Sequence, residues 1–219
     1  MLNERLLCPS MNCANYDCLK EETIALDLAG VDIFHMDIMD GYYMPTMAMG
    51  MGDFKCVRRN TKKPLDVHLY AINPFPLVDV FIGEGADIIY VLPDAPVVTS
   101  NSLDRINLLG KSPGLGINYG TSIESIGDLL YMVDYVMVNT SPNIGPRTFA
   151  PQAWEKVKKL LELRTLTPFK ILLDGAIGLD IVKRASAMGV DGYVLGTVGL
   201  FKPDDKRSYP EYIDEFRRA

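Results

Sequence analysis

The side chains best suited to chemistry in this sequence are two histidines and two aspartates. The chain has only two histidines, His35 in IFHMDIMDG and His68 in PLDVHLY, and each stands at or just before the end of a predicted strand. Asp37 follows His35 by two positions, so both side chains point to the same face of a strand. Asp174 ends a further strand, in ILLDGA. Two imidazoles and two carboxylates at one end of a sheet form a donor set for one divalent ion: Zn²⁺, Fe²⁺, Co²⁺ or Mn²⁺.

Each of these residues also has a purely structural interpretation. A histidine at a strand end is often a hydrogen-bonded core residue, and an aspartate at a strand-to-helix junction often caps the helix. The convergence of all four at one end of a fold favours the metal site.

Short apolar runs alternate with amphipathic helical segments along the whole chain, which indicates parallel β-α-β units. The predicted strands cover residues 5–10, 31–37, 64–69, 86–91, 113–118, 135–138, 169–174 and 192–195, and helical patterns include 19–28, 77–83, 122–132, 152–164 and 179–188. The motifs AGVD, EGAD and MGVD each place a helix-stopping Gly before a strand. Eight such units close an α/β fold of the (β/α)8 (TIM) barrel type, and we expect residues 1–219 to form one domain of this kind.

The bulk composition excludes several classes of function. The net charge of −6 leaves no basic field for a nucleic-acid backbone. There is no run of about twenty apolar residues for a membrane helix, and the start MLNERLLCPS lacks the features of a secretion signal. We therefore expect a cytoplasmic protein with four reduced cysteines. Cys8, Cys13 and Cys18 are spaced by five but fall on a strand and a helix, so they are expected to diverge rather than bind a metal.

Several motifs together resemble the ribulose-phosphate 3-epimerase family. HMDIMDGYYMP, at 35–45, is similar to the family's signature, and CPSMN is similar to its opening strand. KPLDVHL, GLGIN, VMVNTSP and ILLDGAI follow in the family's order and spacing. GVDGYVLGTVGLF resembles its last strand and phosphate loop, particularly in the allulose-6-phosphate 3-epimerase branch. The resemblance covers residues 7–201.

The resemblance implies a metal-dependent 3-epimerase of a phosphorylated ketose, with D-ribulose 5-phosphate converted to D-xylulose 5-phosphate. His35, Asp37, His68 and Asp174 correspond to the ligands of one divalent metal ion per chain. Asp37 and Asp174 correspond also to the acid/base pair, because a proton must leave one face of carbon 3 and another must return to the opposite face. The enediolate between these steps carries negative charge that the metal stabilises. The family also implies a homo-oligomer.

Other residues correspond to the family's substrate contacts. Ser10 ends the first strand, Met39 and Met137 match methionines that cover the reacting carbons, and Tyr70 stands where the family often has a third methionine. The phosphate is expected on two loops that contain Gly175, Ala176, Gly196 and Thr197.

Three departures from the family alter the pocket and leave the four central residues in place. Residues 142–147 read PNIGPR where the family usually has Pro-Gly-Phe-Gly-Gly-Gln. Gly145 and Arg147 of this loop are expected to contact substrate, with Arg147 on the phosphate. The alternative for Arg147 is a side chain that faces solvent. Leu92, Pro93 and Asp94 replace the family's His-x-Glu, and Thr46 replaces an Asn.

These departures keep alternative functions open. One is a 3-epimerase of allulose 6-phosphate or another hexulose phosphate. Another is a catalytically idle barrel that binds a sugar phosphate, although an idle protein has no need of an acid and a base. A phosphate-dependent β-keto-acid decarboxylase would carry Asp-x-Lys-x-x-Asp at a strand end; DFKCVR at 53–58 breaks this pattern and falls in a predicted helix, which rejects that function.

Overall fold

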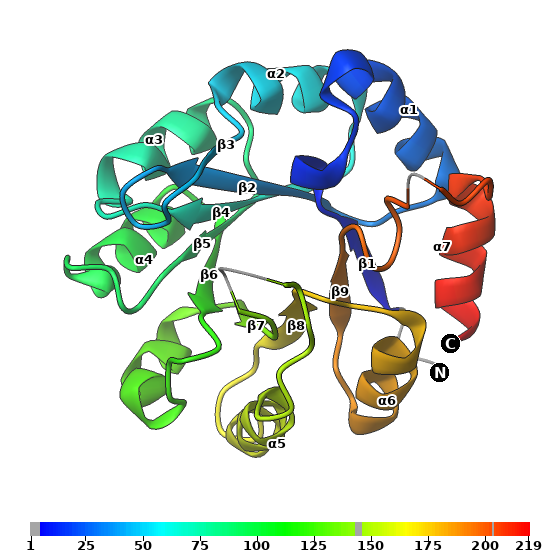
Figure 1. Ribbon diagram of the computed structural model, residues 1–219. Helices are drawn as coiled ribbons and strands as arrows, with labels where there is room; N and C mark the ends of the chain where they lie inside the picture. The colour runs from blue at the N-terminus through cyan, green and yellow to red at the C-terminus, as the bar shows by residue number, and fades with distance from the viewer. Residues whose placement is uncertain (1–4, 143–145, 203) are drawn as a thin grey trace.

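The chain forms a closed barrel of parallel strands. The computed structural model describes residues 5–142, 146–202 and 204–219. Within them, nine strands form one sheet in the order β1-β9-β8-β7-β6-β5-β4-β2-β3, in which all neighbours except β2 and β3 are parallel. A parallel bridge between Ser10 and His35 joins β1 to β2. Figure 1 shows the resulting ring with helices around its outside. The predicted (β/α)8 barrel is confirmed.

The elements alternate along the described chain. The parallel strands are β1 (Leu6–Pro9), β2 (Phe34–Asp40), β4 (Leu65–Tyr70), β5 (Ile88–Val91), β6 (Ser112–Ile117), β7 (Tyr135–Asn139), β8 (Lys170–Asp174) and β9 (Gly192–Leu195). The helices are α1 (Leu19–Ala29), α2 (Met51–Asn60), α3 (Phe75–Gly83), α4 (Thr99–Leu108), α5 (Ala153–Leu163), α6 (Leu179–Met188) and α7 (Tyr209–Arg218), with 3-10 helices η1 (Met11–Cys13), η2 (Tyr16–Cys18) and η3 (Glu124–Met132).

Most predicted boundaries lie within two residues of those in the structure, and two predicted elements differ further. Strand β2 continues to Asp40, three residues past its predicted end, because it pairs antiparallel with the short strand β3 (Met47–Ala48). The predicted helix at 122–132 is the 3-10 helix η3, whose interior Gly127 disfavours an α-helix. Helices α4 and α7 lie outside the helical patterns named above.

The three Gly-x-Asp motifs fix the end of the barrel where the strands begin. Helices α1 and α6 end at Gly30 and Gly189, whose φ angles of 88° and 99° are left-handed and suit glycine. Each following Asp accepts a hydrogen bond from a strand's backbone N–H and pairs with an arginine: Asp32 with Leu7 and Arg217, Asp87 with Leu65 and Arg58, and Asp191 with Ile171 and Arg164. The motifs therefore stop helices and also tie neighbouring strands together.

Apolar side chains fill the barrel interior beneath the opposite end. They are Cys8, Ile33, Ile88, Tyr90, Met137, Leu172 and Val194, each at most 4% exposed. On β6, Gly114 and Gly116 leave room for large rings: a Cβ built on Gly114 would lie 2.4 Å from the ring of Tyr90, and one on Gly116 would lie 2.2 Å from Nε2 of His68. This packed layer supports the polar side chains above it.

Among the described helices, none combines the length and apolar character that a membrane crossing requires.

Candidate active site

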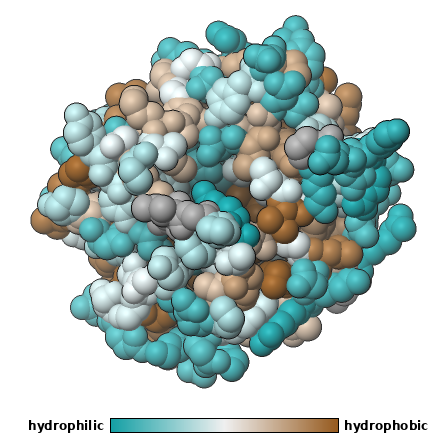
Figure 2. Space-filling view, in the orientation of Figure 1, coloured by the Kyte–Doolittle hydropathy of each residue, from teal (hydrophilic) through white to brown (hydrophobic). Residues whose placement is uncertain are grey.

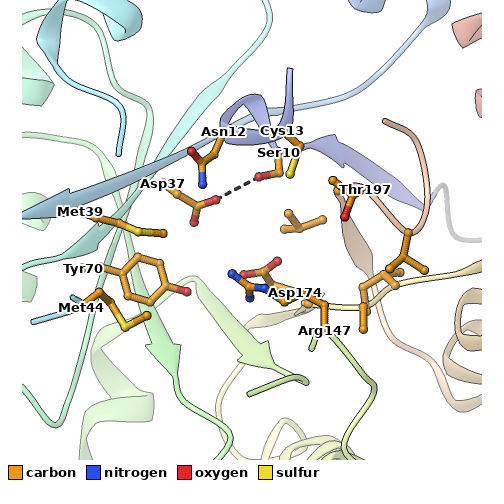
Figure 3. Close-up of a pocket in the computed structure, with 16 residues that line it drawn as sticks. Ser10, Asn12, Cys13, Asp37, Met39, Met44, Tyr70, Arg147, Asp174 and Thr197 are labelled. Carbon is orange, nitrogen blue, oxygen red and sulfur yellow. Dashed lines mark hydrogen bonds between the residues drawn. The ribbon is translucent and has the colours of Figure 1, made fainter. Parts of the chain in front are cut away.

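His35, Asp37, His68 and Asp174 meet at the carboxyl ends of three barrel strands. His35 and Asp37 lie on β2, His68 lies on β4, and Asp174 ends β8. One ligand atom from each residue lies within 4.8 Å of those of the other three. Both histidines are buried, and Asp37 and Asp174 face the same pocket (Figure 3). The structure brings together the four side chains that the sequence analysis singled out.

The ring of His35 is held between two carboxyls. Its Nδ1 lies 2.6 Å from Oδ1 of Asp66, a fully buried residue on β4, and its Nε2 lies 3.0 Å from Oδ1 of Asp37. Burial alone lowers the pKa of His35, but the two carboxyls outweigh it and raise that pKa well above its usual value. A carboxylate behind one ring nitrogen is the usual support of a metal-binding histidine, because it fixes the ring and leaves the other nitrogen for the ion.

The ring of His68 is buried, and its nitrogens form no hydrogen bond within the described part of the chain. Neither of its ring nitrogens has a hydrogen-bond partner among the described residues, and Nδ1 lies 3.7 Å from Oδ1 of Asp37. Burial lowers the pKa of this ring to about 3, so it is held as neutral imidazole. A buried imidazole without a partner is costly unless something else binds it, and neutral imidazole is the form that binds metals. The donor set and this orphaned ring therefore fit a divalent ion.

The two carboxyls of the site have opposite pKa shifts. Burial tends to raise the pKa of Asp37, but His35, His68 and the Ser10 hydroxyl hold it at about 2; Oγ of Ser10 donates to Oδ2 of Asp37 over 3.0 Å. Burial and the neighbouring charge of Asp37 raise the pKa of Asp174 to about 6. Two carboxyls with separated pKa values are typical of an acid and a base that work as a pair. A bound cation would lower the pKa of both.

One wall of the pocket is apolar. Met44, Tyr70 and Leu92 form a buried cluster, with Met39 and Tyr43 packed against it. We call these five residues the apolar cap. Met39, Met44 and Tyr70 line the pocket itself, on the side away from Thr197 (Figure 3). In Figure 2, several hydrophobic side chains lie just to the right of the centre of this face beside hydrophilic ones, and mostly hydrophilic side chains follow its rim. The cap can exclude water from the region beside the carboxyls.

The opposite wall consists of the loops after β8 and β9. Gly175, Ala176, Gly196 and Thr197 all line the pocket there. Gly175 has a φ of 93°, and a Cβ on it would lie 2.5 Å from Oγ of Ser141, so this position requires glycine. Ala176 is also left-handed, with a φ of 54°, and such strain in a residue other than glycine is concentrated at functional sites. Arg147 lines the same pocket, beside Asp174 in Figure 3.

Comparison with known proteins identifies the family. The model of the "Ribulose-phosphate 3 epimerase family" matches residues 6–200. The chain belongs to the ribulose-phosphate 3-epimerase family. The resemblance drawn from its motifs is confirmed.

Curated relatives match the chain over nearly its full length. The ribulose-phosphate 3-epimerase of Aquifex aeolicus is 30% identical and the alignment covers 92% of this chain and 91% of the relative. That of Synechocystis is 31% identical and covers 98% and 94%. That of Escherichia coli K12 is 29% identical and covers 99% and 96%.

Solved structures with low sequence identity share the fold. KGPDC from Streptococcus mutans, in complex with D-R5P, superposes with a TM-score of 0.77 at 14% identity, covering 97% of each chain. 3-Keto-L-gulonate-6-phosphate decarboxylase from Vibrio cholerae gives a TM-score of 0.72 at 13% identity, covering 98% of this chain and 96% of that one. At this level of identity, these neighbours show only that the barrel fold is shared.

The decarboxylase-like segment 53–58 lies in α2, as predicted. There the side chain of Asp53 accepts a hydrogen bond from the backbone N–H of Gly50 and caps the helix.

The structure does not bring every predicted contact to the pocket. Met137, expected over the reacting carbons, is fully buried in the barrel interior and does not line the pocket. It stands one inward-facing position below the end of β7, where Asn139 pairs in register with Asp174. Gly145 lies outside the described residues. Ser10, Met39, Tyr70 and Arg147 do line the pocket.

The residues of the site that were not predicted include Met44, Asn12 and Asp66. Met44 and Asn12 line the pocket, and Asp66 supports His35. Asp66 had a signal in the sequence, since it lies two positions before His68 and so shares its face of the strand. Met44 and Asn12 lie outside the predicted strands and helices, where no periodicity indicates which way a side chain points.

Proposed function

We propose that this protein is a metal-dependent 3-epimerase that interconverts D-ribulose 5-phosphate and D-xylulose 5-phosphate. The observation that carries the proposal is the pair Asp37 and Asp174, which face one pocket with pKa values of about 2 and about 6. They reach it from β2 and β8, strands separated in the barrel by β1 and β9. An exchange of protons between two faces of one carbon requires such a pair.

In the proposed reaction, one ionised carboxylate removes the proton from carbon 3. The electron pair of that C–H bond moves toward the adjacent carbonyl oxygen. The other carboxyl, protonated at that moment, returns a proton to the opposite face of carbon 3. Asp37 suits the first role and Asp174 the second in one direction, and the roles exchange in the reverse direction.

His35, Asp37, His68 and Asp174 would hold the metal ion in this proposal. When bound, a divalent cation supplies a Lewis acid that offsets negative charge on the substrate oxygens. Asp66 orients the ring of His35, and Gly116 gives the ring of His68 its space. The donor set of two imidazoles and two carboxylates suits Zn²⁺, Fe²⁺, Co²⁺ or Mn²⁺.

The two walls of the pocket would hold the two ends of the substrate. The apolar cap would lie over the reacting carbons and exclude water. The loops with Gly175, Ala176, Gly196 and Thr197 would bind the phosphate, with Arg147 at the rim. Binding energy from the phosphate end helps to position the reacting carbon.

Turnover of the metal-loaded protein against a panel of ketose phosphates tests the proposal. D-Ribulose 5-phosphate should have the highest kcat/KM, and unphosphorylated ribulose should react far more slowly. A higher kcat/KM for allulose 6-phosphate or another hexulose phosphate would change the proposed substrate and leave the proposed reaction, 3-epimerisation, unchanged. A protein that binds these sugars but exchanges no proton with solvent would be an idle barrel, and the proposal would be wrong.

A further inference from the structure

Hydrogen bonds hold the beginning of the segment that contributes Tyr43 and Met44 to the apolar cap. Residues 41–50 connect β2 to α2 and include the buried Met44 and Met49. Asp40 stands before this segment and accepts hydrogen bonds from the backbone N–H groups of Tyr42 and Tyr43 through Oδ1, both over 2.8 Å. Its Oδ2 accepts from the N–H of Ile72, after β4, also over 2.8 Å. These contacts orient the first residues of the segment. They do not reach Met44, whose position depends on other contacts.

A second tie lies at Tyr43, across the mouth of the barrel. Its hydroxyl donates to Oδ1 of Asp94, in the loop after β5, over 2.6 Å. Nδ2 of Asn118, which follows β6, donates to the Tyr43 hydroxyl and also to Oδ2 of Asp94, over 3.0 Å in the second case. Thr121 donates to the same Oδ2 over 3.3 Å. Loops from three strands therefore meet at the Tyr43 hydroxyl and the Asp94 carboxylate.

Further hydrogen bonds hold the loop after β6, which contains Asn118, in place. Nζ of Lys156, on α5, donates to the backbone carbonyls of Asn118 and Tyr119, each over 2.7 Å. Burial lowers the pKa of Lys156 to about 8. The anchor for Tyr43 is thus a fixed part of the barrel. The network also gives a structural role to Asp94, one of the residues at which this chain departs from the family's usual His-x-Glu.

The ring of Tyr43 connects this hydrogen-bond network to the active site through ring contacts. It packs against Tyr70, with ring centroids 6.2 Å apart, and Tyr70 packs against His68 at 4.1 Å. Met44, the next residue after Tyr43, packs with Tyr70 in the cap. A chain of contacts therefore runs from Asp94 through Tyr43 and Tyr70 to a proposed metal ligand.

We propose that Tyr43 and Asp94 are positioning residues, a hydrogen-bonded clasp that holds residues 41–50 over the pocket during the reaction. The inference rests on the proposed function, because its consequence is the exclusion of water from the reacting carbons. Neither residue is among those that line the pocket. Their effect is on how long the cap stays closed while a proton is held by Asp37 or Asp174.

Tyr43→Phe tests the clasp because it removes the hydroxyl and keeps the ring. Tyr42→Phe is the matched control, because Tyr42 is the preceding residue and is 82% exposed. Amide hydrogen exchange of residues 41–50 should quicken by about tenfold in Tyr43→Phe, the effect of one or two lost hydrogen bonds. In D2O, the ratio of deuterium in recovered substrate to deuterium in product should rise, since water reaches the transferred proton more often. kcat/KM should fall about five- to tenfold with metal content unchanged.

Asp94→Ala should produce changes in the same direction, and the effects in the double variant should fall well short of the sum of the two single ones, because both substitutions remove the hydrogen bond between Tyr43 and Asp94. Additive effects, or a Tyr43→Phe protein that matches Tyr42→Phe in exchange and in deuterium ratio, would overturn the clasp. Faster amide exchange with unchanged catalysis would overturn its role in positioning. If the wild-type protein epimerises no ketose phosphate, the proposed function fails, and the amide exchange still decides whether the clasp exists.

Discussion

Gly116 provides a sharp test of the link between barrel packing and the metal site. It lies on β6, opposite His68, and a Cβ at this position would lie 2.2 Å from Nε2 of that ring. Contacts of a Cβ below 3.0 Å essentially do not occur, so in Gly116→Ala something must shift. His68 is buried and packs against Tyr70 and Tyr90, which limits the directions in which its ring can move.

The expected size of the effect follows from this distance. The imidazole must move by about 1 Å, and a misplacement of about 1 Å in a catalytic constellation can cost about a hundredfold in rate. We therefore expect kcat/KM to fall by about a hundredfold and metal affinity to fall with it. Extra volume in a packed interior should destabilise the fold by about 1–3 kcal/mol, which lowers Tm by roughly 2–4 °C per kcal/mol in a protein of this size.

Metal content after dialysis, turnover and thermal melting should be measured on the same samples. Gly120→Ala is the control, because a Cβ there meets nothing within 4 Å. It should keep the wild-type metal content and activity. A Gly116→Ala protein that melts like the control, binds one metal ion tightly and turns over at the wild-type rate would refute the assignment of His68 to the metal site.

Three further outcomes follow from the site. Wild-type protein should carry about one divalent ion per chain, and His35→Ala or His68→Ala should lose most of it by elemental analysis; full retention contradicts the ligand set. Asp66→Asn should weaken metal affinity by about 10- to 100-fold in a chelator competition, since Asp66 lies 2.6 Å from the ring of His35. Arg147→Ala should raise KM for the phosphorylated ketose by about tenfold with little change in kcat; an unchanged KM would make Arg147 a bystander.

Much of the fold and of the central site could be predicted because both follow from short periodicities. The alternation of strands and helices predicts the barrel, and the strand period of two places His35 and Asp37 on one face. The barrel then brings the strand ends together, which is why residues more than a hundred positions apart, such as Asp37 and Asp174, could be expected to meet.

The sequence is less informative where the position of a side chain depends on where a strand ends or on how a loop returns to the barrel. The period of two places Met137 and Asn139 on the same face, but only the true end of β7 at Asn139 shows that Met137 lies one layer too deep for the pocket. The contact of Tyr43 with Asp94 joins residues 51 positions apart through two loops, and no periodicity predicts it. Met44 reaches the pocket only because that segment folds back over the barrel.

In the proposed mechanism, Asp37 and Asp174 exchange protons with opposite faces of one carbon. The direct test is Asp174→Asn, with its metal content measured on the same sample, incubated with each epimer in D2O. The wild-type protein should place solvent deuterium at carbon 3 of the product. The metal-loaded variant should lose epimerisation by about a thousandfold or more, yet still exchange the carbon 3 proton of the one epimer that Asp37 faces. Full epimerisation by metal-loaded Asp174→Asn would contradict the two-carboxyl mechanism.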